Sequence, residues 1–174
     1  MTIRALVAAL GSTALLVGLS ACGSPSEAAS PTEGQAQPMQ ADTVRTRDLW
    51  VKAVDGGMSA GFGRLTNTGS ADVVLTSTAS NISSDMELHV TGPDEEGQMV
   101  MSPHEAGFLI APGDTLVLEP GGDHLMFMEV QKPVGPGDTV DLTLTFEDGS
   151  AVDVTAPAKD FTGADEEYVP GTHE

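Results

Sequence analysis

The chain has 174 residues, which is enough for one ordinary domain with additional segments. Its 26 Asp and Glu against 7 Lys and Arg give a formal net charge of −19, which argues against nucleic-acid binding because no basic patch can replace the phosphate counterions. The single cysteine rules out an intrachain disulfide and a cysteine-based zinc site, whereas eight methionines leave open a soft-metal site built from thioethers.

The N-terminal 21 residues have the pattern of an export signal. Arg4 precedes a small and apolar run from residue 5 to residue 19, which is shorter than the ~20 residues of a membrane-spanning helix. The run ends in Leu-Ser-Ala-Cys22, which resembles the lipobox of bacterial lipoproteins, where the cysteine becomes the first mature residue and carries the lipid. We therefore expect a lipoprotein signal peptide over residues 1–21, lipidation of Cys22, and attachment to the outer face of the cell membrane only through this anchor. The alternative is a plain secretory signal with a chance cysteine.

Two further segments differ in composition from the rest. Residues 22–43 are rich in Ser, Pro, Ala, Gly, Glu and Gln and show no apolar period, so they predict a flexible tether. Residues 160–174 are acidic and polar, and we expect this C-terminal tail to be loosely ordered. One domain therefore remains, over residues 44–159.

The pattern between residues 44 and 159 is that of β-strands. Residues 140–146 alternate apolar and polar side chains, which indicates a half-buried strand, and Asp148-Gly149 then predicts a hairpin turn. Shorter strand signals lie between Gly, Pro and Asn turns at residues 49–53, 62–65, 73–75, 115–118 and 151–154. No window of ten or more residues has a helical stripe. Eight or nine short strands predict an all-β protein, a Greek-key sandwich or barrel.

Three short segments concentrate histidine and methionine: Met86-Glu-Leu-His89, then Met99-Val-Met101 with His104 close behind, and His124-Leu-Met126-Phe-Met128. Residues two apart on a strand share a face, so the last segment would place His and Met on one side and Leu and Phe on the other. Thioether sulfur and imidazole suit Cu(I), and the absence of a His₂Cys pattern argues against a blue-copper centre. The segments therefore predict a copper site for Cu(I), with Cu(II) as the second candidate.

The alternative for each residue alone is structural. A single Met on a strand is more often core filler, and a single His is more often structural or exposed than a ligand. His104 is expected in a loop and His173 in a solvated tail, although neither is excluded from the site. The combination within residues 89–126, in a chain with four histidines, is what favours a metal site.

This combination resembles the PCuAC periplasmic copper chaperones, whose signature is His, about ten residues, Met, about twenty-two residues, then His-x-Met. It falls on four residues, His89, Met101, His124 and Met126. Eleven residues separate His89 from Met101, one more than in the signature, and we place this extra residue in the loop at 91–97. Because of this extra residue, Met99 is an alternative to Met101. We favour Met101, because it is the second Met of the Met-x-Met pair, which carries the role in the family. Met128 is a possible further ligand. The similarity extends over residues 48–156, most specifically through the Pro-Gly-Gly-Asp-His-Leu-Met-Phe-Met run at 120–128.

The resemblance implies a cupredoxin-like sandwich that holds copper near its surface. It also implies a carrier that delivers Cu(I) to a membrane cuproenzyme, in particular the copper A centre of cytochrome c oxidase. The acceptor would be oxidase subunit II or a thioredoxin-like copper assembly protein. Exposed ligands would let that acceptor bind copper before the donor releases it.

Other functions stay open. The same site could serve copper buffering or tolerance, or the chain could be a metal-free β-sandwich lipoprotein that binds another protein. An enzyme is disfavoured because G-x-S-x-G, H-E-x-x-H and the phosphate-binding fingerprints are absent from the sequence.

Overall fold

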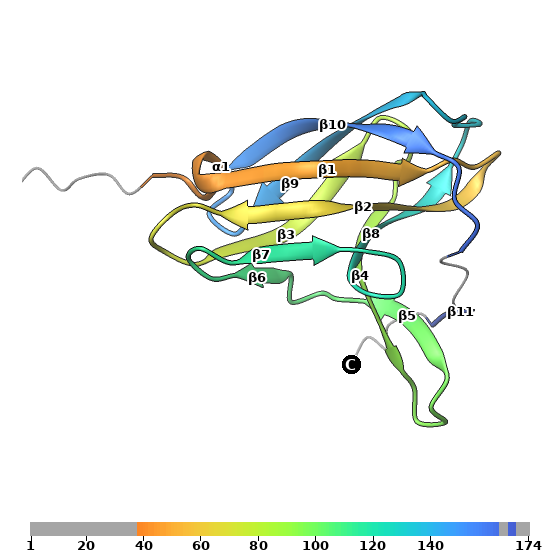
Figure 1. Cartoon of the computed structure of the whole chain (residues 1–174), viewed down its shortest axis with the longest axis horizontal. Coiled ribbons are helices and arrows are strands. Elements are labelled where there is room, and N and C mark those ends of the chain that lie inside the picture. Colours follow the sequence, from red (N-terminus) through yellow and green to blue (C-terminus); the bar gives the residue numbers. More distant parts are fainter. Residues whose placement is uncertain (1–37, 164–166, 170–174) are drawn as a thin grey trace, which may run out of the picture. The chain divides into compact units, whose positions relative to one another are not determined.

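The structure is a computed structural model that describes residues 38–163 and 167–169 (Figure 1). These residues belong to one compact unit, 36–174. The predicted signal peptide, the lipidation site Cys22, most of the predicted tether and His173 lie outside the described residues. Within the described part, no helix has both the length and the apolar character needed to cross a membrane.

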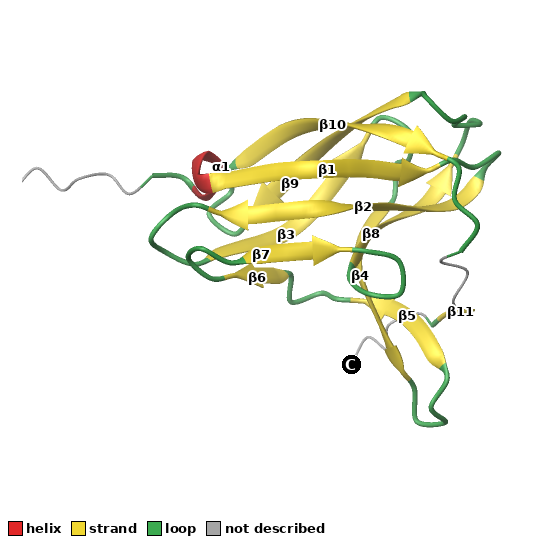
Figure 2. Ribbon diagram, in the orientation of Figure 1, coloured by secondary structure: helices red, strands yellow, loops and turns green. Residues whose placement is uncertain are grey.

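One short helix and eleven strands make up the described part of the chain (Figure 2). They are α1 Gln40–Thr43, β1 Val44–Lys52, β2 Gly57–Asn67, β3 Val73–Ser80, β4 Met86–Pro93, β5 Met99–Pro103, β6 Phe108–Ile110, β7 Thr115–Leu118, β8 His124–Val130, β9 Thr139–Phe146, β10 Ala151–Lys159 and β11 Glu167–Tyr168. The all-β prediction is confirmed. The count exceeds eight or nine because strands as short as β6 and β11 have too few residues to show a period.

The strands form one continuous path, β11-β5-β4-β8-β2-β1-β10-β9-β3-β6, and β7 pairs with β2. All pairs are antiparallel except β1 with β10 and β5 with β11. The link between β1 and β10 is short, with Val51 opposite Ala158 and Lys52 opposite Lys159. Across this link the path folds over, so that β3, β9 and β10 form a layer behind β1, β2, β4 and β8 (Figure 1).

The hydrophobic core lies between these two layers. Strand β9 contributes the four apolar residues of the predicted alternation, Val140, Leu142, Leu144 and Phe146, which are 0–2% exposed. From the other layer, Phe127 of β8 packs beside Gly61 of β2, where an added Cβ would lie 3.2 Å from the Phe127 ring. Burial of each large apolar side chain stabilises the fold by about 1.5–3 kcal/mol.

Strand β1 contains a bulge where it crosses β2. The pairing shifts by one residue before Trp50, whose partner is Phe62. Asp48 in the bulge has φ 53, and on β2 a Cβ added to Gly63 would lie 2.9 Å from the Cα of Leu49. The extra residue changes the direction in which the following side chains of β1 point. As a result Trp50 stands on the same face of the sheet as Phe62, and their rings are 4.6 Å apart.

Asp148 joins the β9–β10 hairpin to the start of α1. Its carboxylate accepts the Gln40 N–H at 2.8 Å and the Ser150 N–H at 2.9 Å. The bond from the Gln40 backbone, followed by the bond from the Ser150 hydroxyl, lowers the pKa of Asp148 below its usual value. We expect Asp148→Ala to lower the free energy of unfolding by about 1–2 kcal/mol at neutral pH, because both backbone donors lose a charged acceptor.

Urea unfolding as a function of pH checks this prediction. Because the folded-state pKa of Asp148 is depressed, its contribution is present above the ordinary Asp range and is lost as the pH falls through the depressed value. The wild type and the variant should therefore converge in acid. The exposed Asp72 provides the control, Asp72→Ala; equal losses in both variants would contradict a specific role for Asp148.

Candidate metal site

The two histidines of the predicted site face each other across neighbouring strands. His89 on β4 is directly opposite His124 on β8 in the strand register. Their ring centroids are 5.4 Å apart, and the planes meet at 67°. Residues directly opposite in an antiparallel pair have adjacent side chains, so two imidazoles that are far apart in the sequence form one pair.

The two methionines lie beside this pair on the same face. Met101 on β5 is opposite Thr91, and Met126 on β8 is opposite Glu87. Since Thr91 and Glu87 are each two residues from His89, both methionines are diagonal neighbours of His89, with Cα separations of about 7–8 Å. They flank the histidine pair from opposite ends. We call this surface of β5, β4 and β8 the His/Met face, defined by His89, Met101, His124 and Met126.

The opposite side of β8 belongs to the hydrophobic core. Leu125 and Phe127 are 1% and 0% exposed and are part of the core cluster. His124 and Met126 alternate with them and point to the other side of the strand. The structure therefore has the two-sided β8 that the alternation predicts, and the His/Met face needs a cover of its own to be shielded from solvent.

The four side chains of the His/Met face are buried. His89 is 0%, His124 and Met126 are 4%, and Met101 is 5% exposed. The expectation of exposed ligands near the surface is therefore wrong for this structure. The C-terminal segment, which was expected to be loosely ordered, contributes to this burial at His89 and Met101.

Strand β11 lies along β5 next to the histidine pair. Tyr168 is opposite Met101, and the Val169 N–H donates to the Met101 carbonyl at 2.9 Å. The Tyr168 ring stacks on His89 with 5.3 Å between centroids and 6° between planes. This part of the tail is thus an added strand whose aromatic ring covers His89.

A second contact holds the start of the same segment. Phe161 meets Trp50 edge to face at 5.5 Å and lies 6.5 Å from Phe62. The Lys52 ammonium donates to the Gly163 carbonyl at 2.6 Å. We refer to residues 161–163 and 167–169 as the C-terminal cover. The bulge in β1 matters here, because it turns Trp50 toward this segment.

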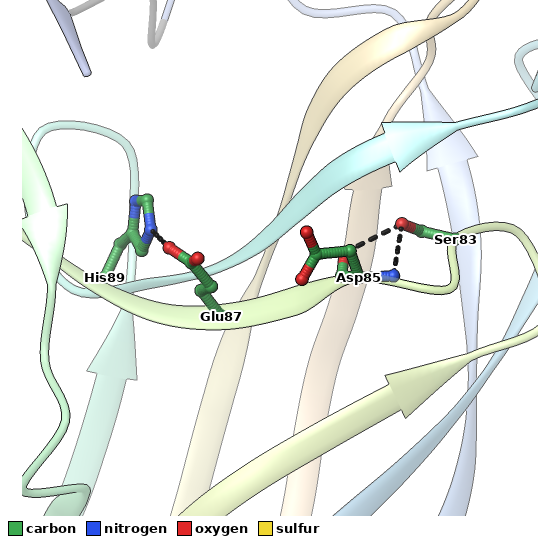
Figure 3. Close-up of polar contacts among 4 residues, drawn as sticks. All are labelled: Ser83, Asp85, Glu87 and His89. Atoms are coloured by element: carbon green, nitrogen blue, oxygen red, sulfur yellow. Dashed lines mark hydrogen bonds and ion pairs between the residues drawn. The ribbon is translucent and has the colours of Figure 1, made fainter. Parts of the chain in front are cut away.

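Hydrogen bonds show which nitrogen of each imidazole donates a proton. His89 Nε2 is 2.6 Å from Glu87 Oε2 (Figure 3); a carboxylate accepts, so Nε2 carries the proton. His124 Nδ1 is 3.0 Å from the Gly122 carbonyl, which can only accept, so Nδ1 donates a proton to that oxygen. His89 Nδ1 is buried and has no hydrogen-bond partner within the described residues.

Negative charge borders the His/Met face. The Glu87 carboxylate accepts a hydrogen bond from His89, and the Tyr168 hydroxyl also interacts with this carboxylate. Burial raises the pKa of Tyr168, and the charges of Glu87 and Asp85 raise it further. A cation on this face would meet carboxylates nearby and neutral nitrogen and sulfur donors.

The other sequence candidates are placed differently. Met99 is 51% exposed and opposite Pro93, four residues along β4 from His89, or about 13 Å. Met128 is half-buried and lies four residues from His124 along β8. His104 stacks on Phe108 of the core at 5.3 Å. These residues are outside the cluster formed by the four favoured ligands.

The residues that surround the predicted ligands, Glu87, Tyr168 and Phe161, were not predicted from the sequence. Glu87 precedes His89 by two residues, and this spacing on a strand already places both on one face. Tyr168 and Phe161 gave no comparable signal, because isolated aromatic residues in an acidic tail have no period. Among the described residues no group of three or more His, Cys, Asp or Glu is placed to hold a metal ion. The donor set of this face is two imidazoles and two thioethers.

Separate replacement of the two methionines of β5 tests which one is the ligand. We expect Met101→Ala to weaken Cu(I) binding by about tenfold or more, because the structure places Met101 diagonally beside His89. Met99→Ala is the matched control and should change the affinity by less than about threefold. Competition with a chromophoric Cu(I) chelator measures both. A larger effect of Met99→Ala would reverse the assignment.

Comparisons with known proteins show which family and fold the chain shares. A model of the LpqE-like lipoproteins matches residues 44–158. A protein of Leifsonia xyli subsp. xyli, named as a lipoprotein, is 40% identical over 155 residues, which cover 89% of this chain and 90% of the relative.

Three solved structures share the fold. The apo PCuAC domain from PmoF1 has a TM-score of 0.58 at 20% identity and covers 68% of this chain and 95% of that domain. The copper-bound PCuAC domain from PmoF2 has a TM-score of 0.57 at 16% identity, covering 68% and 94%. The Cu(I) form of DR1885 from Deinococcus radiodurans has a TM-score of 0.51 at 22% identity, covering 75% and 85%. The PCuAC-type β fold implied by the sequence resemblance is confirmed.

Proposed function

The chain belongs to the LpqE-like lipoprotein family, and we propose that it is an extracytoplasmic, lipid-anchored copper chaperone. Copper is its cargo, bound as one Cu(I) by His89, Met101, His124 and Met126. The observation that supports this most directly is His89 Nδ1, which is buried beside the His124 ring without a hydrogen-bond partner in the described residues. Leaving such an atom unsatisfied costs about 1–3 kcal/mol, and coordination of a metal would remove this cost.

The donor set agrees with a soft cation. Thioether sulfur is polarisable and uncharged and favours Cu(I), and imidazole binds copper in either oxidation state. Mg²⁺ and Ca²⁺ prefer oxygen ligands, which the four favoured residues do not offer. Cu(II) is the second candidate, with weaker binding, because it gains less from the two thioethers. Two of the structures with this fold, from PmoF2 and DR1885, contain copper.

The binding proposal is tested by loading the purified chain with Cu(I) under anaerobic, reducing conditions. We expect one copper per chain, and X-ray absorption should show two nitrogen and two sulfur neighbours. Protein that retains no stoichiometric copper would overturn the proposal and favour the metal-free interaction module.

Delivery is the function that we propose for the bound copper. Lipidation at Cys22 would keep the domain at the outer face of the cell membrane, where a membrane cuproenzyme can be reached. The acceptor would be the copper A centre of cytochrome c oxidase subunit II or a thioredoxin-like copper assembly protein. Because the ligands are buried, copper would pass through a shared-ligand intermediate only after Tyr168 has moved off His89.

Delivery and buffering predict different phenotypes. A deletion strain at low copper should lose oxidase activity if the chain delivers copper, and added copper should restore it. Normal oxidase activity together with sensitivity to excess copper would instead support buffering or tolerance.

A further inference from the structure

Glu87 occupies a central position beside the predicted ligands. It is two residues before His89 on β4 and directly opposite Met126 on β8. Its side chain is 30% exposed, yet one oxygen lies 2.6 Å from His89 Nε2, and the Tyr168 hydroxyl also bonds to it. The carboxylate is therefore held between a residue of the His/Met face and a residue of the C-terminal cover.

We propose that Glu87 is a positioning residue of the copper site: by accepting the Nε2–H of His89 it fixes the imidazole ring and presents Nδ1 to the metal. The copper part of this inference rests on the proposed function. A histidine that binds a metal through one nitrogen commonly donates its other N–H to a carboxylate, which fixes the tautomer and makes the ligand more basic. Figure 3 shows Nδ1 on the side of the ring that faces away from Glu87.

The surroundings of His89 favour this arrangement over a simple ion pair. A charged His89 would carry a second N–H on Nδ1, and this buried atom has no acceptor within the described residues. A neutral ring instead leaves a lone pair there, which costs less to bury. Stacking of Tyr168 on the ring also holds the imidazole of His89 in place.

The test combines tautomer and affinity measurements on the full chain. Nitrogen-15 NMR of the metal-free wild type should show His89 protonated at Nε2 and unprotonated at Nδ1. In Glu87→Leu this preference should be lost, and Cu(I) affinity should fall by about 10- to 100-fold. Glu87→Gln keeps the size of the side chain and an acceptor oxygen without the charge, so its Cu(I) affinity should lie between those of the wild type and Glu87→Leu. If Glu87→Leu does not fold, Glu87→Gln serves as the test variant.

The exposed Glu129 on the neighbouring strand β8 provides the matched control, Glu129→Leu. Proton occupancy at His89 Nδ1 in the wild type would overturn the inference, as would equal Cu(I) affinities of the Glu87 variants and the control. A wild type that binds no copper but is protonated at Nε2 would overturn the proposed function and the copper part of this inference, while supporting the tautomer.

Discussion

Replacing His124 and Met126 together with alanine is expected to weaken Cu(I) binding by at least about a thousandfold. Structural Zn²⁺ sites with four ligands bind with about 10–16 kcal/mol; on that scale the loss of two of four ligands removes several kcal/mol, and each 1.4 kcal/mol is a factor of ten. Both residues are buried on the same side of β8, next to His89 and Glu87 respectively. The residues that alternate with them, Leu125 and Phe127, point into the core and cannot replace them.

Competition against a chromophoric Cu(I) chelator measures this loss. The matched control also removes one histidine and one methionine, His104→Ala with Met99→Ala, which lie outside the cluster. The control should change affinity by less than about threefold. An affinity of the His124 and Met126 double variant equal to that of the control would reject the site.

Phe127→Ala is expected to lower the free energy of unfolding by about 3–5 kcal/mol. Phe127 is 0% exposed and is among the largest fully buried side chains of the core. It packs beside Gly61 of β2, so its removal leaves a cavity that the neighbouring backbone cannot easily fill. This residue lies next to Met126 in the chain but on the opposite side of the sheet.

Denaturant unfolding of the metal-free protein measures the stability difference. Phe161→Ala, in the C-terminal cover and 37% exposed, is the control and should cost about 1 kcal/mol or less. The milder variant Phe127→Leu should keep its Cu(I) affinity within about threefold, because the side chain does not touch the His/Met face. Similar losses in Phe127→Ala and Phe161→Ala would contradict a β8 with one side in the core.

The C-terminal cover lies over the predicted ligands, and this would change how the proposed copper transfer works. The resemblance implied exposed ligands that an acceptor could approach directly, but the four predicted ligands are at most 5% exposed. Most of the C-terminal cover is held by noncovalent ring contacts and by a two-residue strand. Elements of this kind open more easily than the core, so a chaperone could combine a shielded metal with release to a partner.

The strands and their sides were predictable from the sequence because strand alternation is local. Residues 140–146 show period two and form the predicted strand of the core. The same period puts His124 and Met126 on one side of β8 and Leu125 and Phe127 on the other. The spacing that resembles the PCuAC signature depends only on residue types along the chain, and the fold that this resemblance implied is shared with a solved PCuAC domain.

Only the tertiary structure decided which side chains meet. His89 and His124 become neighbours through the register of β4 and β8, which depends on side-chain packing on both faces and is not encoded in either strand alone. The bulge at Asp48 breaks the period of β1 and turns Trp50 toward Phe161. Composition suggested a loose acidic tail, yet Tyr168 stacks on His89, because one aromatic ring can gain enough from burial and stacking to order a short segment that has no pattern of its own.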